Sequence, residues 1–345
     1  MVVTETSCAR DPLQCIIPPY MLERLAESGY LDHPDHPDLA QRARDSMLRS
    51  IETRAFREAT RAAPQLLVSP SPDGGKHRLI YDAGGSFDLP GKLVRSEGDA
   101  DTGDMAVREA YRHTGSVWNY FNTVHGRNSL DGLGMTLESC VHVGRNYSNA
   151  FWDGSRMGFG DGDGILFRRF TRSIEVVAHE LAHGVIAFSG NLRYYGESGA
   201  LNEHFGDVFG VLVHQWKRRQ EARGADWTIG SDLLFKAATR RALRDMAAPG
   251  TAYRDDRSWA TIPSLLIGTT ATGAIRITAE STSTRESPTT PSTGRRSSWV
   301  ATPGKRSGMS GTSRCSCSRP TAVSRTVPRS PSGKRLANMA SAAAK

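Results

Sequence analysis

The sequence has few cysteines and no long apolar run. Five cysteines among 345 residues exclude a disulfide-rich scaffold. Cys315 and Cys317 have no histidine near them and lack the spacing of a zinc finger. No apolar stretch reaches the length of a membrane-spanning helix, and the first thirty residues lack the basic region and apolar stretch of a Sec-type signal. We therefore expect no membrane partner.

Aromatic residues and acidic charge are scarce in the last quarter of the chain. Residues 257–345 contain no Phe, Tyr or His, and they carry 14 Lys and Arg against two Glu. Residues 1–256 carry 30 Lys and Arg against 34 Asp and Glu, although the whole chain has a formal net charge of +8. A nucleic-acid-binding domain needs a basic face on its folded body, so this distribution argues against nucleic acid as a partner.

Composition and apolar spacing divide the chain into four segments, and together they predict an α+β fold. Residues 1–60 are mostly helical by pattern. Residues 61–178 have the short strands and turns of a β-rich lobe, with one helix over residues 104–124. Residues 179–256 are mainly helical and carry the chemistry. Residues 257–345 have no sustained periodicity, so we expect them to be disordered.

Two acidic segments outside the main motif could bind a metal, but both favour turns. Residues 33–38 alternate His, Pro and Asp, and proline prevents the helix or strand geometry that would bring these ligands together. Residues 160–164 alternate Gly and Asp, which does not fit an EF-hand loop. We expect a solvated turn in the first and a tight turn in the second.

The chemical signal is the motif His179-Glu180-Leu181-Ala182-His183. Two histidines four residues apart lie on one helical face, so both imidazoles can reach one zinc ion. Glu180 follows the first ligand and can act as a base toward water at that ion. Two surface histidines would explain a motif this short about equally well, so the residues that follow decide between the two interpretations.

Two carboxylates follow this motif at a helical spacing. Glu203 stands twenty residues after His183, and Asp207 stands four residues further on. Ser198 can cap a helix that carries both carboxylates on one face. Glu203 is then a candidate third zinc ligand, and Asp207 can accept the remaining N–H of a ligand histidine. A solvated acidic face explains either residue alone, but not both at this spacing after such a motif.

These motifs resemble those of the thermolysin-family neutral zinc metalloendopeptidases, in the protealysin-like branch with a short propeptide. The resemblance covers residues 15–256. It is carried by residues 15–22, which match the opening of the propeptide, and by residues 78–83, 89–91, 94–95, 109–111, 149–152, 157–164, 179–185 and 198–210. It implies a thermolysin-like fold with a β-rich N-terminal lobe, zinc-site helices and a truncated helical C-terminal lobe.

The resemblance assigns roles to the metal-site residues. It implies that Zn²⁺ is bound by His179, His183 and Glu203, with water in the fourth place. Glu180 is the general base that takes the water's proton and returns it to the leaving amine. Asp207 and Asn202 would contact the ligand histidines on the side that faces away from the metal.

The resemblance also implies which residues bind the substrate. Tyr194 matches the tyrosine that stabilises the oxyanion. Asn149 and Ala150 match the strand edge that binds a peptide backbone, and Arg244 matches the arginine that holds a substrate carbonyl. The expected partners are peptide or protein substrates and the chain's own propeptide, residues 1 to about 60, which would block the active site until it is removed.

Calcium and localisation are open at this point. Structural Ca²⁺ is typical of the family, but only Glu175 stands where a calcium carboxylate is expected, and His214 occupies the place of another. We therefore treat calcium as doubtful. The family is usually exported, so the chain is expected to be secreted, with a cytoplasmic location as the alternative because no signal is visible.

The resemblance stops at Asp256, and the chain has no histidine after His214. The family continues with a segment whose histidine is a second oxyanion donor. Suppose one base was lost near Arg257. Each true codon then joins the third base of one visible codon to the first two bases of the next. Shifted in this way, residues 277–293 permit Asn-Gly-Gly-Val-His-Ile-Asn-Ser-Gly-Ile-Pro-Asn-His-Ala-Phe-Tyr, which contains the missing family segment in order.

We therefore expect residues 257–345 to be an out-of-frame translation. Two hypotheses follow for the function. The first is a zinc-dependent endopeptidase that hydrolyses peptide bonds through a zinc-activated water, with Glu180 as general base. The second is a catalytically impaired, zinc-binding remnant of such an enzyme, because the oxyanion histidine is missing.

Overall fold

A computed structural model describes residues 15–27, 36–60, 68–194, 196–235, 242–252, 266–269 and 275–278. All of these residues belong to one compact unit of the chain. Cys315 and Cys317, the start of the 33–38 turn and most of the basic tail lie outside the described residues. Among the helices that the structure describes, none is both long and apolar enough to cross a membrane.

A five-stranded mixed sheet forms the N-terminal lobe, in the order β2-β1-β3-β5-β4. Strand β1 pairs antiparallel with β2 and parallel with β3, while β5 pairs parallel with β3 and antiparallel with β4. The strand β4 therefore lies at one edge of the sheet. The bounds are β1 (Arg78–Asp82), β2 (Lys92–Ser96), β3 (Leu137–Val141), β4 (Ala150–Trp152) and β5 (Met157–Phe159).

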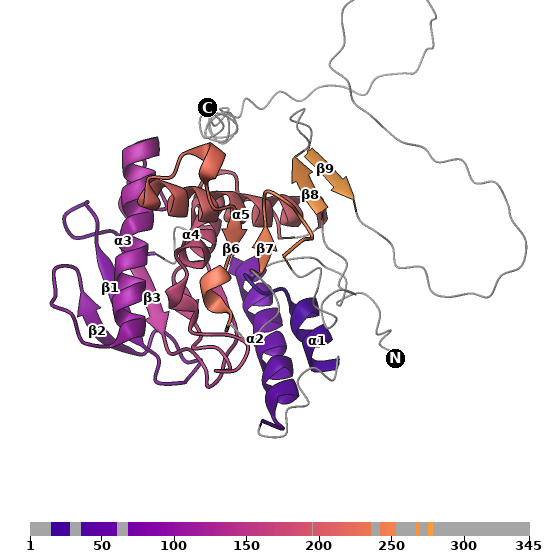
Figure 1. Ribbon diagram of the computed structural model, residues 1–345. Coiled ribbons are helices and arrows are strands. Elements are labelled where there is room, and N and C mark those ends of the chain that lie inside the picture. The colour runs from indigo at the N-terminus through magenta and orange to yellow at the C-terminus, as the bar shows by residue number, and fades with distance from the viewer. Residues whose placement is uncertain are drawn as a thin grey trace, which may run out of the picture. The chain divides into compact units, whose positions relative to one another are not determined.

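Helix α3 (Met105–His125) packs across β1, β2 and β3 (Figure 1). The helix begins where Asp104 accepts hydrogen bonds from the N–H groups of Ala106 and Val107. It ends at Gly126, whose left-handed backbone (φ 62°) turns the chain away. The expected helix over residues 104–124 is therefore present, shifted by one residue.

Helices α4 (Ile174–Ser189) and α5 (Gly196–Arg218) pack closely against each other and carry the chemical motif. Ser173 caps α4 by accepting from the N–H of Val176, and the first thirteen residues of α4 are buried. The expected cap of α5 at Ser198 is wrong. The helix begins two residues earlier, and the Ser198 hydroxyl donates to the carbonyl of Arg193.

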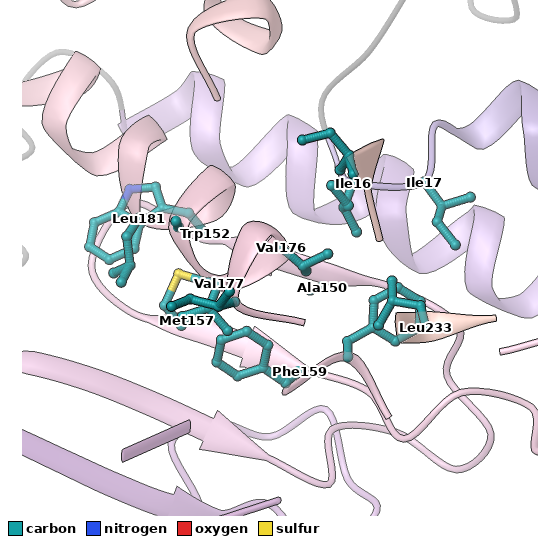
Figure 2. Close-up of a cluster of buried hydrophobic side chains, with 14 of the residues drawn as sticks. Ile16, Ile17, Ala150, Trp152, Met157, Phe159, Val176, Val177, Leu181 and Leu233 are labelled. Carbon is teal, nitrogen blue, oxygen red and sulfur yellow. The ribbon is translucent and has the colours of Figure 1, made fainter. Parts of the chain in front are cut away.

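Two N-terminal helices, α1 (Pro19–Glu27) and α2 (Leu39–Thr60), pack against each other, and the residues before α1 reach the core of the sheet lobe. Ile16 and Ile17 are fully buried and belong to the same apolar cluster as residues of β4, β5 and α4. Figure 2 draws these two isoleucines with Ala150, Val176 and Leu233. The N-terminal segment is thus an integral part of the described core.

The remaining elements are short. They are β6 (Thr228–Ile229) paired with β7 (Arg244–Asp245), the hairpin of β8 (Leu266–Thr269) and β9 (Ile275–Thr278), and the 3₁₀ turns η3 (Phe170–Arg172), η4 (Ala222–Gly224) and η5 (Ser231–Leu233). The hairpin lies inside residues 257–345, the segment that we expected to be disordered. Both strands are rich in Ile and Thr, which favour extended backbone.

His142 ties the end of β3 to two neighbouring segments. Its Nε2 lies 3.2 Å from Asp104 at the start of α3, and its Nδ1 lies 2.8 Å from Asp161 in the 160–164 turn. The hydrogen bond to Asp161, helped by the charge of Asp104, raises the pKa of His142 to about 9, although partial burial acts in the opposite direction. Protonated His142 therefore bridges two carboxylates.

This bridge predicts a pH-dependent contribution to stability. Because the folded pKa of His142 lies above the unfolded value of about 6.5, its stabilisation is complete below that pH and is lost as the pH rises through about 9. Between acidic and alkaline buffer, the unfolding free energy of the unaltered chain should fall by about 1 kcal/mol more than that of the His142→Asn variant. Asparagine accepts the positive φ of this position. Denaturant titration of both chains at about pH 6 and pH 10 tests this, and parallel pH profiles would contradict it.

Candidate metal centre

One face of α4 presents the two histidines of the motif. His179 and His183 stand one helical turn apart, and both side chains are fully buried. Their rings meet edge to face with centroids 4.7 Å apart. The two Nε2 atoms lie 3.1 Å from each other. Two ring nitrogens this close need a cation or a shared proton between them.

Glu203 of α5 completes the cluster. Its carboxylate oxygens lie 3.2 Å from Nε2 of His179 and 3.4 Å from Nε2 of His183. Two ligands about 2.0–2.1 Å from one tetrahedral zinc ion are about 3.3 Å apart, which matches these separations. Within the described residues, these three are the group of His, Cys, Asp and Glu whose donor atoms converge enough to hold a metal ion. The donor set therefore fits zinc.

The opposite nitrogens of both histidines have oxygen partners. Nδ1 of His179 lies 2.9 Å from Oδ1 of Asp207, and Nδ1 of His183 lies 2.8 Å from Oδ1 of Asn202. An acceptor at Nδ1 keeps the proton there and leaves Nε2 with its lone pair directed toward the metal position. Both residues that were expected to support the ligands thus contact them.

Two carboxylates lie within hydrogen-bond distance of the His179 ring. Burial alone would lower its pKa, but hydrogen bonds to Asp207 and Glu203 outweigh burial and raise the pKa to about 9. Asp207 also accepts two hydrogen bonds from Arg244, of 2.6 and 2.8 Å. Burial would raise the pKa of Asp207, but Arg244 and His179 outweigh burial and hold the pKa well below its usual range. Asp207 is thus ionised, and a metal ion must displace any proton from Nε2 of His179.

Glu180 is fully buried and points toward backbone N–H groups. Its two carboxylate oxygens accept from the N–H of Trp152 in β4 and from the N–H of Ile16, each at 3.1 Å. Trp152 and Ile16 also belong to the apolar cluster in Figure 2. The carboxylate therefore lies between the edge strand and the N-terminal segment.

Two of the three residues expected to bind substrate, Asn149 and Arg244, contact the N-terminal segment in this structure. Asn149 accepts from the N–H of Ile17 at 3.1 Å and donates to the carbonyl of Ile17 at 2.9 Å. Arg244 donates to the carbonyl of Ile16 at 2.8 Å. Ala150, the other expected edge residue, is buried in β4 and donates its N–H to Oδ1 of Asn149. Residues 16 and 17 thus make the contacts that the resemblance assigns to a bound peptide.

Tyr194 lies close to the cluster, in the segment before α5. The side chain is buried, and its ring meets that of His183 with centroids 5.7 Å apart. This places a phenol beside one of the two motif histidines.

The position expected for calcium has a different chemistry. Glu175 at the start of α4 forms an ion pair with Nδ1 of His214 at 2.7 Å and accepts a hydrogen bond from Ser173. Burial would raise the pKa of Glu175, but the contacts with His214 lower it. The buried carboxylate therefore has a cationic partner within the chain.

Gly206 is a site residue that the sequence analysis missed. A Cβ built on Gly206 would lie 2.7 Å from both Cε1 and Nδ1 of the His179 ring. On the same face of α5, a Cβ on Gly210 would lie 2.8 Å from the carbonyl of Glu175. These glycines, four residues apart, let α5 approach α4 closely enough for Glu203 to reach the histidines. Their four-residue spacing is visible in the sequence, and it could have indicated that two helices pack closely at this face.

We expect Gly206→Ala to weaken zinc binding by about 10- to 100-fold, because the added methyl group must displace the His179 ring from Asp207. Zinc affinity can be measured by competition with a chelator of known affinity. Gly224→Ala is the matched control, since nothing lies within 4 Å of a Cβ at that position. Equal affinities in the two variants would contradict the prediction.

Comparison with known proteins agrees with this arrangement. Family models described as the catalytic domain and the alpha-helical domain of thermolysin metallopeptidase match residues 73–187 and 190–280. The second match runs past Asp256, where we expected the resemblance to end.

Individual relatives point the same way. An extracellular metalloprotease of Pectobacterium carotovorum is 42% identical over 71% of this chain and 68% of its own. Protease PrtS of Photorhabdus is 50% identical over 52% of this chain, which spans about half the length of that relative, 48%.

Among solved structures, the precursor of protealysin, a metalloproteinase from Serratia proteamaculans, matches with a TM-score of 0.58 and 45% identity. The match covers 70% of this chain and 67% of that one. The matched α+β architecture is the thermolysin-like fold that the motifs predicted. The chain belongs to the thermolysin family of metallopeptidases.

Proposed function

We propose that this chain is a zinc-dependent endopeptidase in which Glu180 is the general base. The observation that supports it most strongly is the pair of contacts made by Ile16. Its amide nitrogen lies 3.1 Å from the Glu180 carboxylate, and its carbonyl accepts from Arg244. A peptide bond in this place has its nitrogen beside a carboxylate that can protonate it, next to a cluster that fits a metal.

The chemistry then follows from proton positions. Glu180 takes a proton from water as the water oxygen attacks the substrate carbonyl carbon. The same carboxyl group returns that proton to the amide nitrogen as the carbon–nitrogen bond breaks, which leaves a carboxyl group and an amine. The N–H of Trp152 holds the second carboxylate oxygen throughout and so fixes the direction in which the first one points.

Metal binding is assigned to His179, His183 and Glu203. Zinc held there supplies a Lewis acid for the substrate carbonyl and lowers the pKa of nearby water. Tyr194 is the proposed donor to the oxyanion. Asp207 and Asn202 keep the ligand histidines in the tautomer that exposes Nε2.

Substrates are peptides or proteins, bound through their backbone. Asn149 has a carbonyl and an amide group that can pair with one residue of an extended chain, as they do with Ile17. Ala150 follows in β4, which lies at the edge of the sheet. An added strand is the ordinary ligand of such an edge.

The N-terminal segment is proposed to be an autoinhibitory propeptide. Residues 16 and 17 already occupy Glu180, Asn149 and Arg244, so a substrate cannot bind until they leave. A relative of solved structure is named as a precursor, and another is named extracellular. We infer that this chain too is a zymogen and is exported.

The tail bears on whether this chain is active. We propose that residues 257–345 are read out of frame, because shifted codons over residues 277–293 permit the family segment that is missing. The missing segment contains a histidine, and this chain has no histidine after His214. The absence favours a second candidate function, a zinc-binding remnant with impaired catalysis.

Glu180→Gln tests the proposed role of the base. In the chain with the frame restored, the variant should retain zinc but lose about 10²–10⁴-fold or more in the rate of casein hydrolysis, because glutamine cannot accept the proton of water. Metal content by mass spectrometry is the control for an intact site. Unchanged turnover would refute the role.

Restoring one base at codon 257 tests the frame. The restored chain should express in soluble form and hydrolyse casein, whereas the chain as written should be slower by about 10²–10³-fold from the loss of one oxyanion donor alone. Intact mass must verify both proteins. Casein hydrolysis by the unaltered chain at the rate of the restored one would contradict the proposal.

A further inference from the structure

Helix α2 presents a polar stripe to the sheet lobe. Arg42, Ser46 and Ser50 follow one another at four-residue intervals, so they share one helical face. Arg42 donates to the carbonyl of Asp163 at 3.1 Å, and the Ser46 hydroxyl accepts from the N–H of Ser148 at 3.1 Å. Both serine side chains are buried. The helix therefore contacts the lobe through hydrogen bonds to the 160–164 turn and to the segment before β4.

Ser50 reaches the substrate-binding residue itself. Its hydroxyl accepts from Nδ2 of Asn149 at 2.9 Å and donates to the carbonyl of Ser46 at 2.8 Å. The Asn149 side chain then makes four hydrogen bonds. Oδ1 accepts from the N–H groups of Ile17 and Ala150, and Nδ2 donates to Ile17 and Ser50. A carboxamide has two donors and two acceptor sites, so all of its capacity is used.

A merely helical role for these hydroxyls is the simpler explanation. Serine and threonine in helices commonly donate to the carbonyl four residues back, and Ser50 does so. Thr53 makes the same bond to Arg49, on an exposed part of α2. The difference lies in the oxygen lone pair. Ser50 and Ser46 use it to accept from Asn149 and Ser148, so both hydroxyls join the helix to the lobe.

We propose that Ser46 and Ser50 form a hydroxyl latch through which α2 holds the inhibitory segment in place. The inference rests on the proposed autoinhibition and extends it. Ser50 is a positioning residue: its hydrogen bond fixes Asn149 in the orientation that pairs with Ile17.

Release of the site then requires that α2 detach from Ser148 and Asn149, and not only that residues 16 and 17 withdraw. The latch is polar, so its groups can exchange protein partners for water when α2 leaves. An apolar contact of the same size would resist separation more strongly.

Amide hydrogen exchange in the full chain tests the latch, with Ser50→Ala, Ser46→Ala and the control Thr53→Ala. Ser50→Ala leaves one buried N–H of Asn149 unpaired, so the Ile17 amide should exchange about 10- to 100-fold faster. Ser46→Ala should accelerate the Ser148 amide in the same way. Thr53→Ala should change neither. Amides of α4 and β3 should keep their rates in all three variants, which separates a local release from general destabilisation.

Exchange needs neither zinc nor catalysis, so its outcome is independent of whether the chain hydrolyses peptides. Rates at Ile17 in Ser50→Ala that equal those in Thr53→Ala would overturn the latch and leave the proposed autoinhibition standing. Equal acceleration at all amides would also overturn it, because Ser50 would then support the fold in general. An unprotected Ile17 amide in the unaltered chain would overturn both the docked segment and the latch.

Discussion

The site depends on the hydrogen bonds that the ionised Asp207 carboxylate accepts from two sides. It accepts from Nδ1 of His179 on one side and from the guanidinium of Arg244 on the other. Buried but hydrogen-bonded to His179 and ion-paired with Arg244, it can stay charged where an unpaired carboxylate would not. One carboxylate therefore orients both a metal-ligating ring and the arginine that holds a backbone carbonyl, and displacement of either partner alters the other.

Close approach of α4 and α5 makes that interaction geometrically feasible. Without a side chain at Gly206, the backbone of α5 lies directly against the His179 ring, and Glu203 and Asp207 reach the same imidazole from one helical face. The packing of the two helices consequently holds the ligand nitrogens and the carboxylate together.

Much of this arrangement could be predicted from local spacing, because helical periodicity fixes which residues share a face. His179 with His183, and Glu203 with Asp207, follow from a four-residue interval. The start of α5 could not be predicted, because the Ser198 hydroxyl serves the Arg193 carbonyl and not a helix N–H. Nor could the contacts of Ile16 with Glu180 and of Ile17 with Asn149, since they join segments more than 130 residues apart through a fold that no local pattern specifies.

The sequence predicts α2 only as a helix, because its contacts too depend on segments that are distant in the sequence. Arg42, Ser46 and Ser50 are ordinary residues of a solvated face by composition. Their spacing has meaning only once the 160–164 turn and the segment before β4 lie beside them. In the proposed autoinhibition, the N-terminal segment must fill the site and must also be able to leave it. Backbone contacts at Glu180, Asn149 and Arg244 imitate a substrate and so need no specialised sequence in the segment. In the proposed latch, the hydroxyls of α2 supply what those contacts lack, which is a set of hydrogen bonds that depends on the side chains of this N-terminal segment.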